Sequence, residues 1–323
     1  MKTLLLAALI GLLLILPQVN GLQLNPMVKG SPIKIVETDN YFVVGTSSSL
    51  RIFSKDGEIV NFLNVHGLSD FVIDGETIYI TTFSQRFPNV RAYSFPSLEK
   101  IWDFFPSMLV FDENLVWQEK ETKSWGIKLS TNGILVASGY TLYLLDKDGN
   151  VLRNFTANND IWDVAEKDHK IYLATQEGYV YVLNEDFKLK DKIKVCERYQ
   201  LINPVSNETI GSVSRSVWQI SSDLIATCED GSIFFIKNGK KIQLVQYSRS
   251  FLNNYYYGLR RETSLTDQLY KNIRLLDTPN GALAFSSTNL ALIKNESEEW
   301  KIPLGVLSVD FYGDRIYVMS GLE

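Results

Sequence analysis

The chain has 323 residues, of which 45% are hydrophobic and 12% aromatic, so it can bury a large core and does not have the composition of a disordered protein. Its formal net charge is −5. This acidic balance argues against a broad nucleic-acid-binding surface, and we expect no nucleic-acid partner.

Residues 1–21 have the composition of a secretory signal peptide. One lysine precedes an apolar run from Leu4 to Leu16, and Pro17 and small or polar residues follow. This is the order of the charged, apolar and cleavage regions of such signals. We expect an exported chain, secreted or in the cell envelope, that begins near Leu22 after cleavage. The alternative is an uncleaved N-terminal anchor, which would be the chain's sole membrane contact, although the run is short for a span of about 20 residues.

From Pro32 onward one phrase returns several times. It reads "YFVVGTSSSLRIFSKDGEIVNF", then "GILVASGYTLYLLDKDGNVLRNF", then "KIYLATQEGYVYVLNEDFKLKDKI". Each copy predicts an apolar strand that ends in small residues, an aromatic and aliphatic strand, a tight turn, and a strand that alternates with polar residues. With the apolar strand that precedes each copy, the unit has four strands. Repeated four-stranded units without helices predict an all-β fold, a β-propeller of antiparallel blades over residues 22–323.

The turn between the third and fourth strands is often Asp-Gly or Asn-Gly, as at Asp56, Asp148 and Asn238. These pairs are typical of two-residue hairpin turns in which both central residues take positive φ. We therefore expect that turn type in the blades.

The spacing of the repeats predicts seven blades, with six or eight left open. Most intervals are about 33 to 39 residues, close to one propeller blade. Six full units are followed by a pair of strands, "VLSVDFYG" and "DRIYVMSGLE", that would begin an incomplete last blade. The segment "LQLNPMVKGSP" could supply a closing strand. The stretch "SMLVFDENLVWQEKETK" is too short for a blade and is either an irregular blade or an inserted hairpin.

The units "KIYLATQEGYVYVLNED" and "ILVASGYTLYLLDKDGNVL" resemble the quinoprotein-like (PQQ-type) propeller repeat, in which a strand ending in Gly or Ala-Thr leads into a Gly-led hairpin containing Asp or Asn. The resemblance extends over 32–323 and implies the propeller fold. The family's tryptophan after the hairpin is matched loosely at Trp102 and Trp300. An enzyme of this family would need a calcium site and acidic catalytic residues at the propeller centre, and the sequence shows no such cluster. We expect no catalytic residue, cofactor or metal, and a protein that is not an enzyme.

Two long insertions, 197–216 and 248–271, each lie between a fourth strand and the next first strand. In a propeller such connections emerge on one face, together with the second-to-third loops such as 83–91. The second insertion carries four basic and two acidic residues in an acidic protein, and exposed Tyr and Arg are enriched at binding hot spots. The partner-binding candidates are Arg86, Phe87, Tyr199, Tyr255, Tyr256, Tyr257, Arg260 and Arg261. The alternative for the three tyrosines of the second insertion is that they pack over the blade edges.

Cys196 and Cys228, the two cysteines, fall in adjacent repeats of a chain that we expect to be exported. A disulfide is permitted there, and two separate buried thiols are the alternative. Of three N-glycosylation sequons, the one at Asn207 lies in a predicted loop and is the best acceptor.

These features predict an exported protein-binding scaffold, in the cell envelope or outside the cell, whose partner is another envelope or extracellular protein. One alternative is a glycan or small-ligand binder that uses the central channel. A less favoured alternative is a quinoprotein-like enzyme.

Overall fold

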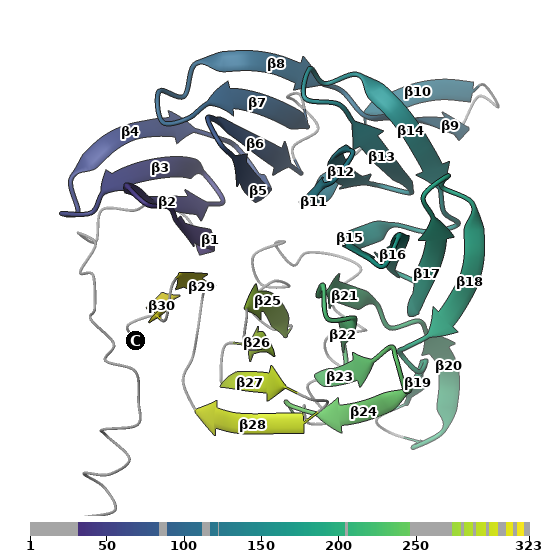
Figure 1. Ribbon diagram of the computed structural model, residues 1–323. Helices are drawn as coiled ribbons and strands as arrows, with labels where there is room; N and C mark the ends of the chain where they lie inside the picture. The colour runs from purple at the N-terminus through teal and green to yellow at the C-terminus, as the bar shows by residue number, and fades with distance from the viewer. Residues whose placement is uncertain are drawn as a thin grey trace, which may run out of the picture.

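The computed structural model describes residues 32–83, 89–111, 117–121, 123–203, 206–245, 273–278, 281–286, 289–294, 297–302, 308–312 and 315–319. These residues form antiparallel blades arranged in a ring (Figure 1), so the chain is an all-β propeller, as the repeats predict. Within these ranges no helix is long and apolar enough to cross a membrane.

The first three blades come from the N-terminal half. Blade 1 consists of β1 (Pro32–Glu37), β2 (Tyr41–Thr46), β3 (Ser49–Ser54) and β4 (Ile59–Asn64). Blade 2 consists of β5 (Leu68–Asp74), β6 (Thr77–Thr82), β7 (Val90–Ser94) and β8 (Lys100–Phe104). Blade 3 consists of β11 (Ser124–Ser130), β12 (Gly133–Ser138), β13 (Thr141–Leu145) and β14 (Val151–Thr156).

The next three blades complete the set of four-stranded sheets. Blade 4 consists of β15 (Ile161–Lys167), β16 (Lys170–Thr175), β17 (Tyr179–Asn184) and β18 (Leu189–Lys194). Blade 5 consists of β21 (Val217–Ile220), β22 (Ile225–Cys228), β23 (Ser232–Phe235) and β24 (Lys240–Gln243). Blade 6 consists of β25 (Arg274–Thr278), β26 (Gly281–Phe285), β27 (Leu290–Lys294) and β28 (Ser297–Ile302).

Three pairs of strands form sheets of their own. They are β9 (Ser107–Phe111) with β10 (Trp117–Glu121), β19 (Tyr199–Ile202) with β20 (Thr209–Val213), and β29 (Ser308–Tyr312) with β30 (Arg315–Met319). The β29–β30 pair lies between blade 6 and blade 1 and contacts both β25 and β1 (Figure 1). The described residues therefore contain six complete blades and a two-stranded seventh, where the repeats predict seven blades. Of the segment 22–32, which could supply a closing strand, Pro32 begins β1 and the rest lies outside the described residues.

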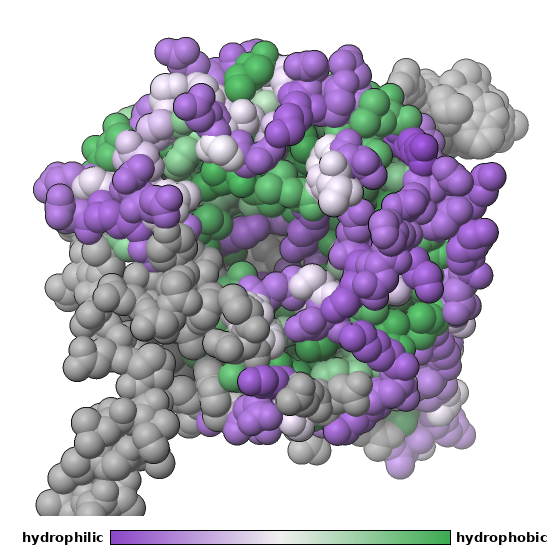
Figure 2. All heavy atoms as spheres, in the orientation of Figure 1, coloured by the Kyte–Doolittle hydropathy of each residue, from purple (hydrophilic) through white to green (hydrophobic). Residues whose placement is uncertain are grey.

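Each blade buries its faces against the next blade. Val43 and Leu50 of blade 1 pack with Leu68 and Ile78 of blade 2 in one buried cluster. The corresponding clusters join blades 2 and 3, 3 and 4, 4 and 5, and 5 and 6. The second strand of a blade is buried on both faces, and this accounts for continuous apolar runs such as β12, whereas the outer fourth strands β14 and β18 are largely exposed. Figure 2 shows mostly hydrophilic residues at the right of the ring, where β14 and β18 lie in Figure 1.

The hairpin turns differ from the expected type. In the turns after β3 and β13 the glycine alone has positive φ, 88° at Gly57 and 86° at Gly149, while Asp56 and Asp148 do not. The strand pairing slips by one residue beside each turn. The prediction of two positive-φ residues was wrong, because these loops combine a single left-handed residue with a β-bulge. In blade 4 the left-handed position is taken by Phe187, whose ring is buried between blades 3 and 4.

Candidate functional site

The two faces of the ring carry connections of very different length. Fourth-to-first and second-to-third connections emerge on one face, which we call the insertion face, and the other turns emerge on the opposite face. The described turns of the opposite face contain two to five residues. On the insertion face, by contrast, β9–β10 follows β8 and β19–β20 follows β18. Of the two alternatives for this part of the chain, the structure has an inserted pair of strands, because β9 and β10 form a two-stranded sheet separate from the blades. The Tyr143 hydroxyl of blade 3 donates a hydrogen bond to the Ser107 carbonyl over 3.1 Å.

Of the eight predicted partner-binding residues, one lies within the residues that the structure describes. The candidates Arg86, Phe87, Tyr255, Tyr256, Tyr257, Arg260 and Arg261 lie outside the described residues. Tyr199 is in β19 with 8% of its surface exposed, and the Arg215 guanidinium lies 5.0 Å from its ring centroid. Because the ring is buried, it offers little contact area to a partner in this arrangement, contrary to the exposed role expected for it. Asn207 is exposed in the loop between β19 and β20, where the sequence predicts an acceptor.

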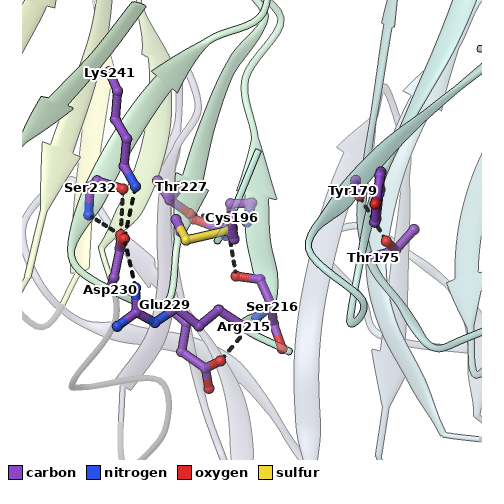
Figure 3. The surroundings of a disulfide bond; sticks show 12 residues. Thr175, Tyr179, Cys196, Arg215, Ser216, Thr227, Glu229, Asp230, Ser232 and Lys241 are labelled. Carbon is purple, nitrogen blue, oxygen red and sulfur yellow. Dashed lines mark hydrogen bonds and ion pairs between the residues drawn. A yellow bond between two sulfur atoms is a disulfide. The ribbon is translucent and has the colours of Figure 1, made fainter. Parts of the chain in front are cut away.

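A disulfide bond anchors the β19–β20 hairpin. Of the two alternatives for the cysteines, the structure has the bond, with the Cα atoms of Cys196 and Cys228 5.7 Å apart and both side chains buried (Figure 3). Cys196 follows β18 of blade 4, and Cys228 ends β22 of blade 5. The bond therefore joins the start of the insertion to the inner part of the next blade.

The other end of the insertion is held by charged side chains next to the disulfide. Glu229 accepts a hydrogen bond from the Ser216 backbone N–H over 2.9 Å. Asp230 pairs with Arg215 at 3.2 Å and with Lys241 at 2.8 Å (Figure 3). Burial raises the pKa of Asp230, but hydrogen bonds from Lys241 and Ser232 outweigh that effect and leave the pKa below its usual value. The hairpin thus projects from a base that is rigidly attached to blade 5.

A recurrent β-bulge shapes the inner strands at the centre of the ring. In five blades the pairing of the first strand with the second slips just after the first residue. A bulge interrupts the alternation of side chains and redirects those beside it. The second residues of these strands, which lie at the slip, are Ile33, Ser69, Trp125, Trp162 and Trp218.

The three tryptophans form a continuous arc with Phe83 along blades 2 to 5. The ring centroids of Phe83 and Trp125 are 6.4 Å apart, those of Trp125 and Trp162 4.7 Å, and those of Trp162 and Trp218 4.6 Å. First strands start at the insertion face, so the arc lies near that end of the central channel. The indole N–H groups of Trp162 and Trp218 are buried and have no hydrogen-bond partner among the described residues.

A polar girdle follows the arc one residue further along the inner strands. It consists of the third residues of five inner strands together with Arg274 of β25, namely Lys34, Asp70, Gly126, Asp163, Gln219 and Arg274. These residues line a cavity of about 220 Å³ on the ring axis. A hollow is visible at the middle of the ring in Figure 2.

The girdle links neighbouring blades. Lys34 pairs with Asp70 at 3.0 Å, Asp163 accepts from the Ile220 N–H at 3.2 Å, and Gln219 accepts from the Leu275 N–H at 2.7 Å. Gly126 has no side chain with which to make such a link. A Cβ at this position would lie 3.0 Å from an Asp163 oxygen, so the close approach of Asp163 favours glycine here.

The charges at the cavity are buried enough to affect one another. Burial raises the pKa of the Asp163 carboxyl, and Lys128 and two backbone N–H groups partly offset this effect. The Asp163 carboxylate in turn raises the pKa of the Lys128 ammonium. Lys128 therefore carries its positive charge at neutral pH. Among the described residues, no three His, Cys, Asp or Glu side chains are grouped so that they could hold a metal ion.

Sequence reasoning missed the tryptophan arc, although the sequence contains a signal for it. "SWGIKL", "IWDVAE" and "VWQISS" place Trp125, Trp162 and Trp218 at the same position of three successive repeats. The comparison with the quinoprotein-like repeat directed attention instead to Trp102 and Trp300. Aligning the first strands of the repeats rather than the hairpins would have revealed the arc.

Comparison with known proteins supports the fold and goes no further. No family model matches the chain, and no curated protein matches it. Among solved structures, the computationally designed Ika8 protein aligns with a TM-score of 0.55 at 10% identity, covering 91% of this chain and 94% of the designed one. The Pan2 WD40 domain of Neurospora crassa aligns with a TM-score of 0.51 at 14% identity, covering 88% of this chain and 85% of that domain. These likenesses identify the chain's fold as a β-propeller.

Proposed function

We propose that the chain is an exported protein-binding scaffold, in the cell envelope or outside the cell, and that it binds its partner through the insertion face. The observation that carries the proposal is the asymmetry of the ring. The long departures from the four-strand repeat, β9–β10, β19–β20 and the stretch 248–271, all fall on fourth-to-first connections. Extended loops confined to one face of a repeat fold are typical of a binding surface.

Two further features support the proposal. The β19–β20 hairpin forms no sheet with any blade and exposes Ile210 to 55%, so that its strands add surface without completing the fold. The disulfide at its base suits an oxidising compartment, in agreement with the signal-like residues 1–21. A rigid base lowers the entropy that a loop loses on binding, which favours the partner complex.

The hairpin can be removed without touching a blade. Tyr199 pairs with Val213, so the ends of the segment 199–213 are adjacent and a short Gly-Ser linker can replace it while both cysteines remain. The matched control is Lys147→Ala with Lys188→Ala, which changes two exposed side chains in opposite-face turns. Far-ultraviolet circular dichroism and thermal melting should show that both variants keep the fold.

Affinity capture from envelope extracts then tests the proposal. We expect the intact mature chain and the opposite-face control to retain the same specific partner, and the hairpin deletion to lose it or bind it much more weakly. Equal retention by the deletion, or an equal loss with the opposite-face control, would contradict a binding site that includes this hairpin. Export is tested separately, since secreted material should begin near Leu22, and an N-terminal sequence beginning at Met1 would refute cleavage.

A further inference from the structure

The cavity on the ring axis has a wall with balanced formal charge but unbalanced hydrogen bonding. Three cationic and three anionic side chains line it: Lys34, Lys128, Arg274, Asp70, Asp163 and Asp277. Their charges cancel formally, so charge counting alone predicts no preference for a ligand of either sign. What decides the preference is which of these groups already have partners.

The acceptors of the wall are engaged by the protein itself. Asp70 accepts from Lys34 at 3.0 Å and from the Phe71 N–H at 2.8 Å. Both oxygens of Asp277 accept from the Ser222 N–H, at 3.0 and 2.9 Å. The carboxylate of Asp163 and the amide oxygen of Gln219 are likewise used to hold the backbone of the next blade.

The donors of the wall are not all engaged. Lys34 donates to Asp70 and to the Phe71 carbonyl, and Arg274 donates to the Ile33 carbonyl. By contrast, the Lys128 ammonium has no hydrogen bond, and no carboxylate lies within the 4.0 Å of an ion pair, among the described residues. The buried indole N–H groups of Trp162 and Trp218 are also without acceptors in that part of the chain. The wall therefore has donors to spare and no comparable supply of acceptors.

We propose that this cavity binds a small organic anion, a carboxylate carried on a single ring, with Lys128 as the charge partner of the carboxylate. A hydrogen bond to a charged group is stronger than one between neutral groups, so Lys128 is the group that gains most from an anionic acceptor. The volume of about 220 Å³ is below that of a pocket for a drug-sized ligand, which limits the ligand to about one ring. The tryptophan arc supplies a broad apolar wall for that ring.

The competing explanation is that Lys128 is only a distant counter-charge for Asp163. The two explanations make different predictions, because a counter-charge affects stability but does not discriminate between a carboxylate and its neutral isostere. The site is also separate from the β19–β20 hairpin, so deletion of 199–213 should leave ligand binding unchanged.

Fluorescence titration of the folded mature chain tests the proposal, since the tryptophans lie at the site. The probes are glucuronate and benzoate, each with its neutral counterpart, glucose and benzamide, at low ionic strength. We expect at least one carboxylate to change the emission in a saturable way, while its neutral counterpart does not. If neither carboxylate binds, or if the neutral counterpart binds equally well, the proposal is overturned.

Variants of Lys128 locate the site. Lys128→Met should weaken carboxylate binding about tenfold or more, the equivalent of one charge-assisted hydrogen bond, and Lys128→Arg should retain most of it. Circular dichroism checks that each variant is folded. Wild-type affinity in a folded Lys128→Met protein would overturn the assignment. Should that variant fail to fold, the wild-type comparison of each carboxylate with its neutral counterpart still decides between the two explanations.

Discussion

Breaking the bond between Cys196 and Cys228 should lower the free energy of unfolding by an amount set by the loop that it closes. The two cysteines are 32 positions apart in sequence. In the chain-entropy account, closing a loop of about 32 residues stabilises the folded state by about 3.7 kcal/mol at 25 °C. This is a large fraction of the roughly 5–15 kcal/mol by which a protein of ordinary stability exceeds its unfolded state.

Urea unfolding followed by tryptophan fluorescence measures this difference directly. Oxidised protein should unfold at a clearly higher urea concentration than protein held under reducing conditions. The variant Cys196→Ala with Cys228→Ala is the matched control, because its midpoint should not respond to the reductant. Before reduction, the denatured protein should show no titratable thiol.

Either of two results would refute the reasoning. Two reactive thiols in the unreduced, denatured protein would show that the bond is absent. A bond that is present, together with equal midpoints for oxidised and reduced protein, would show that it does not restrict the unfolded chain as the loop-closure argument requires.

Three other expectations follow from individual contacts. Gly149→Ala should destabilise the protein by about 1–2 kcal/mol or more in thermal or urea unfolding, because the glycine has φ 86° and a Cβ would lie 2.8 Å from the Trp102 ring; an unchanged midpoint would contradict this. Asp163→Ala should lower the free energy of unfolding by about 2–4 kcal/mol, since it leaves a backbone N–H of blade 5 without its acceptor. Asp163→Asn should lower it less in the same urea titration, and equal decreases for the two variants would argue against the hydrogen bond. The pKa of Asp230 is lowered in the folded protein, so its contribution to folding stability is present above the unfolded pKa of about 3.9 and is lost as the pH falls through the folded pKa. Lys241→Ala should therefore make the unfolding midpoint less sensitive to acid, and a pH profile identical to that of the wild type would contradict this.

The sequence could predict the blades because each blade repeats the same physical problem. A second strand that is buried on both faces must be apolar, whereas an outer fourth strand that is largely exposed can carry polar residues. The pairs β12 with β14 and β16 with β18 show the same contrast. The turns were harder to predict. Asp-Gly fits both a turn with two left-handed residues and a turn with one left-handed glycine and a bulge, and strand register decides between them.

The centre of the ring could not be predicted in the same way. The hairpin phrases that reveal the repeat come from the outer strands, whereas the cavity is lined by inner strands whose pairing slips at Trp125, Trp162 and Trp218. Whether Cys196 reaches Cys228 also depends on how closely two blades approach, which spacing along the chain does not determine. The contact residues predicted in 248–271 rest on the sequence pattern alone, since this stretch lies outside the described residues.

The slipped pairing of the inner strands has a consequence for how such a protein can change over time. A side chain beside the slip is released from the strict in-and-out alternation that the blade's core imposes on its neighbours. Lys34, Asp70, Gly126, Asp163 and Gln219 therefore occupy equivalent places in their blades, yet they share neither size nor charge. Each of these five blades therefore contributes one side chain to the axis that does not belong to its stacking surfaces. Substitutions at these positions can alter the chemistry of the channel wall one blade at a time, at a cost set by the link that each side chain makes to the neighbouring blade.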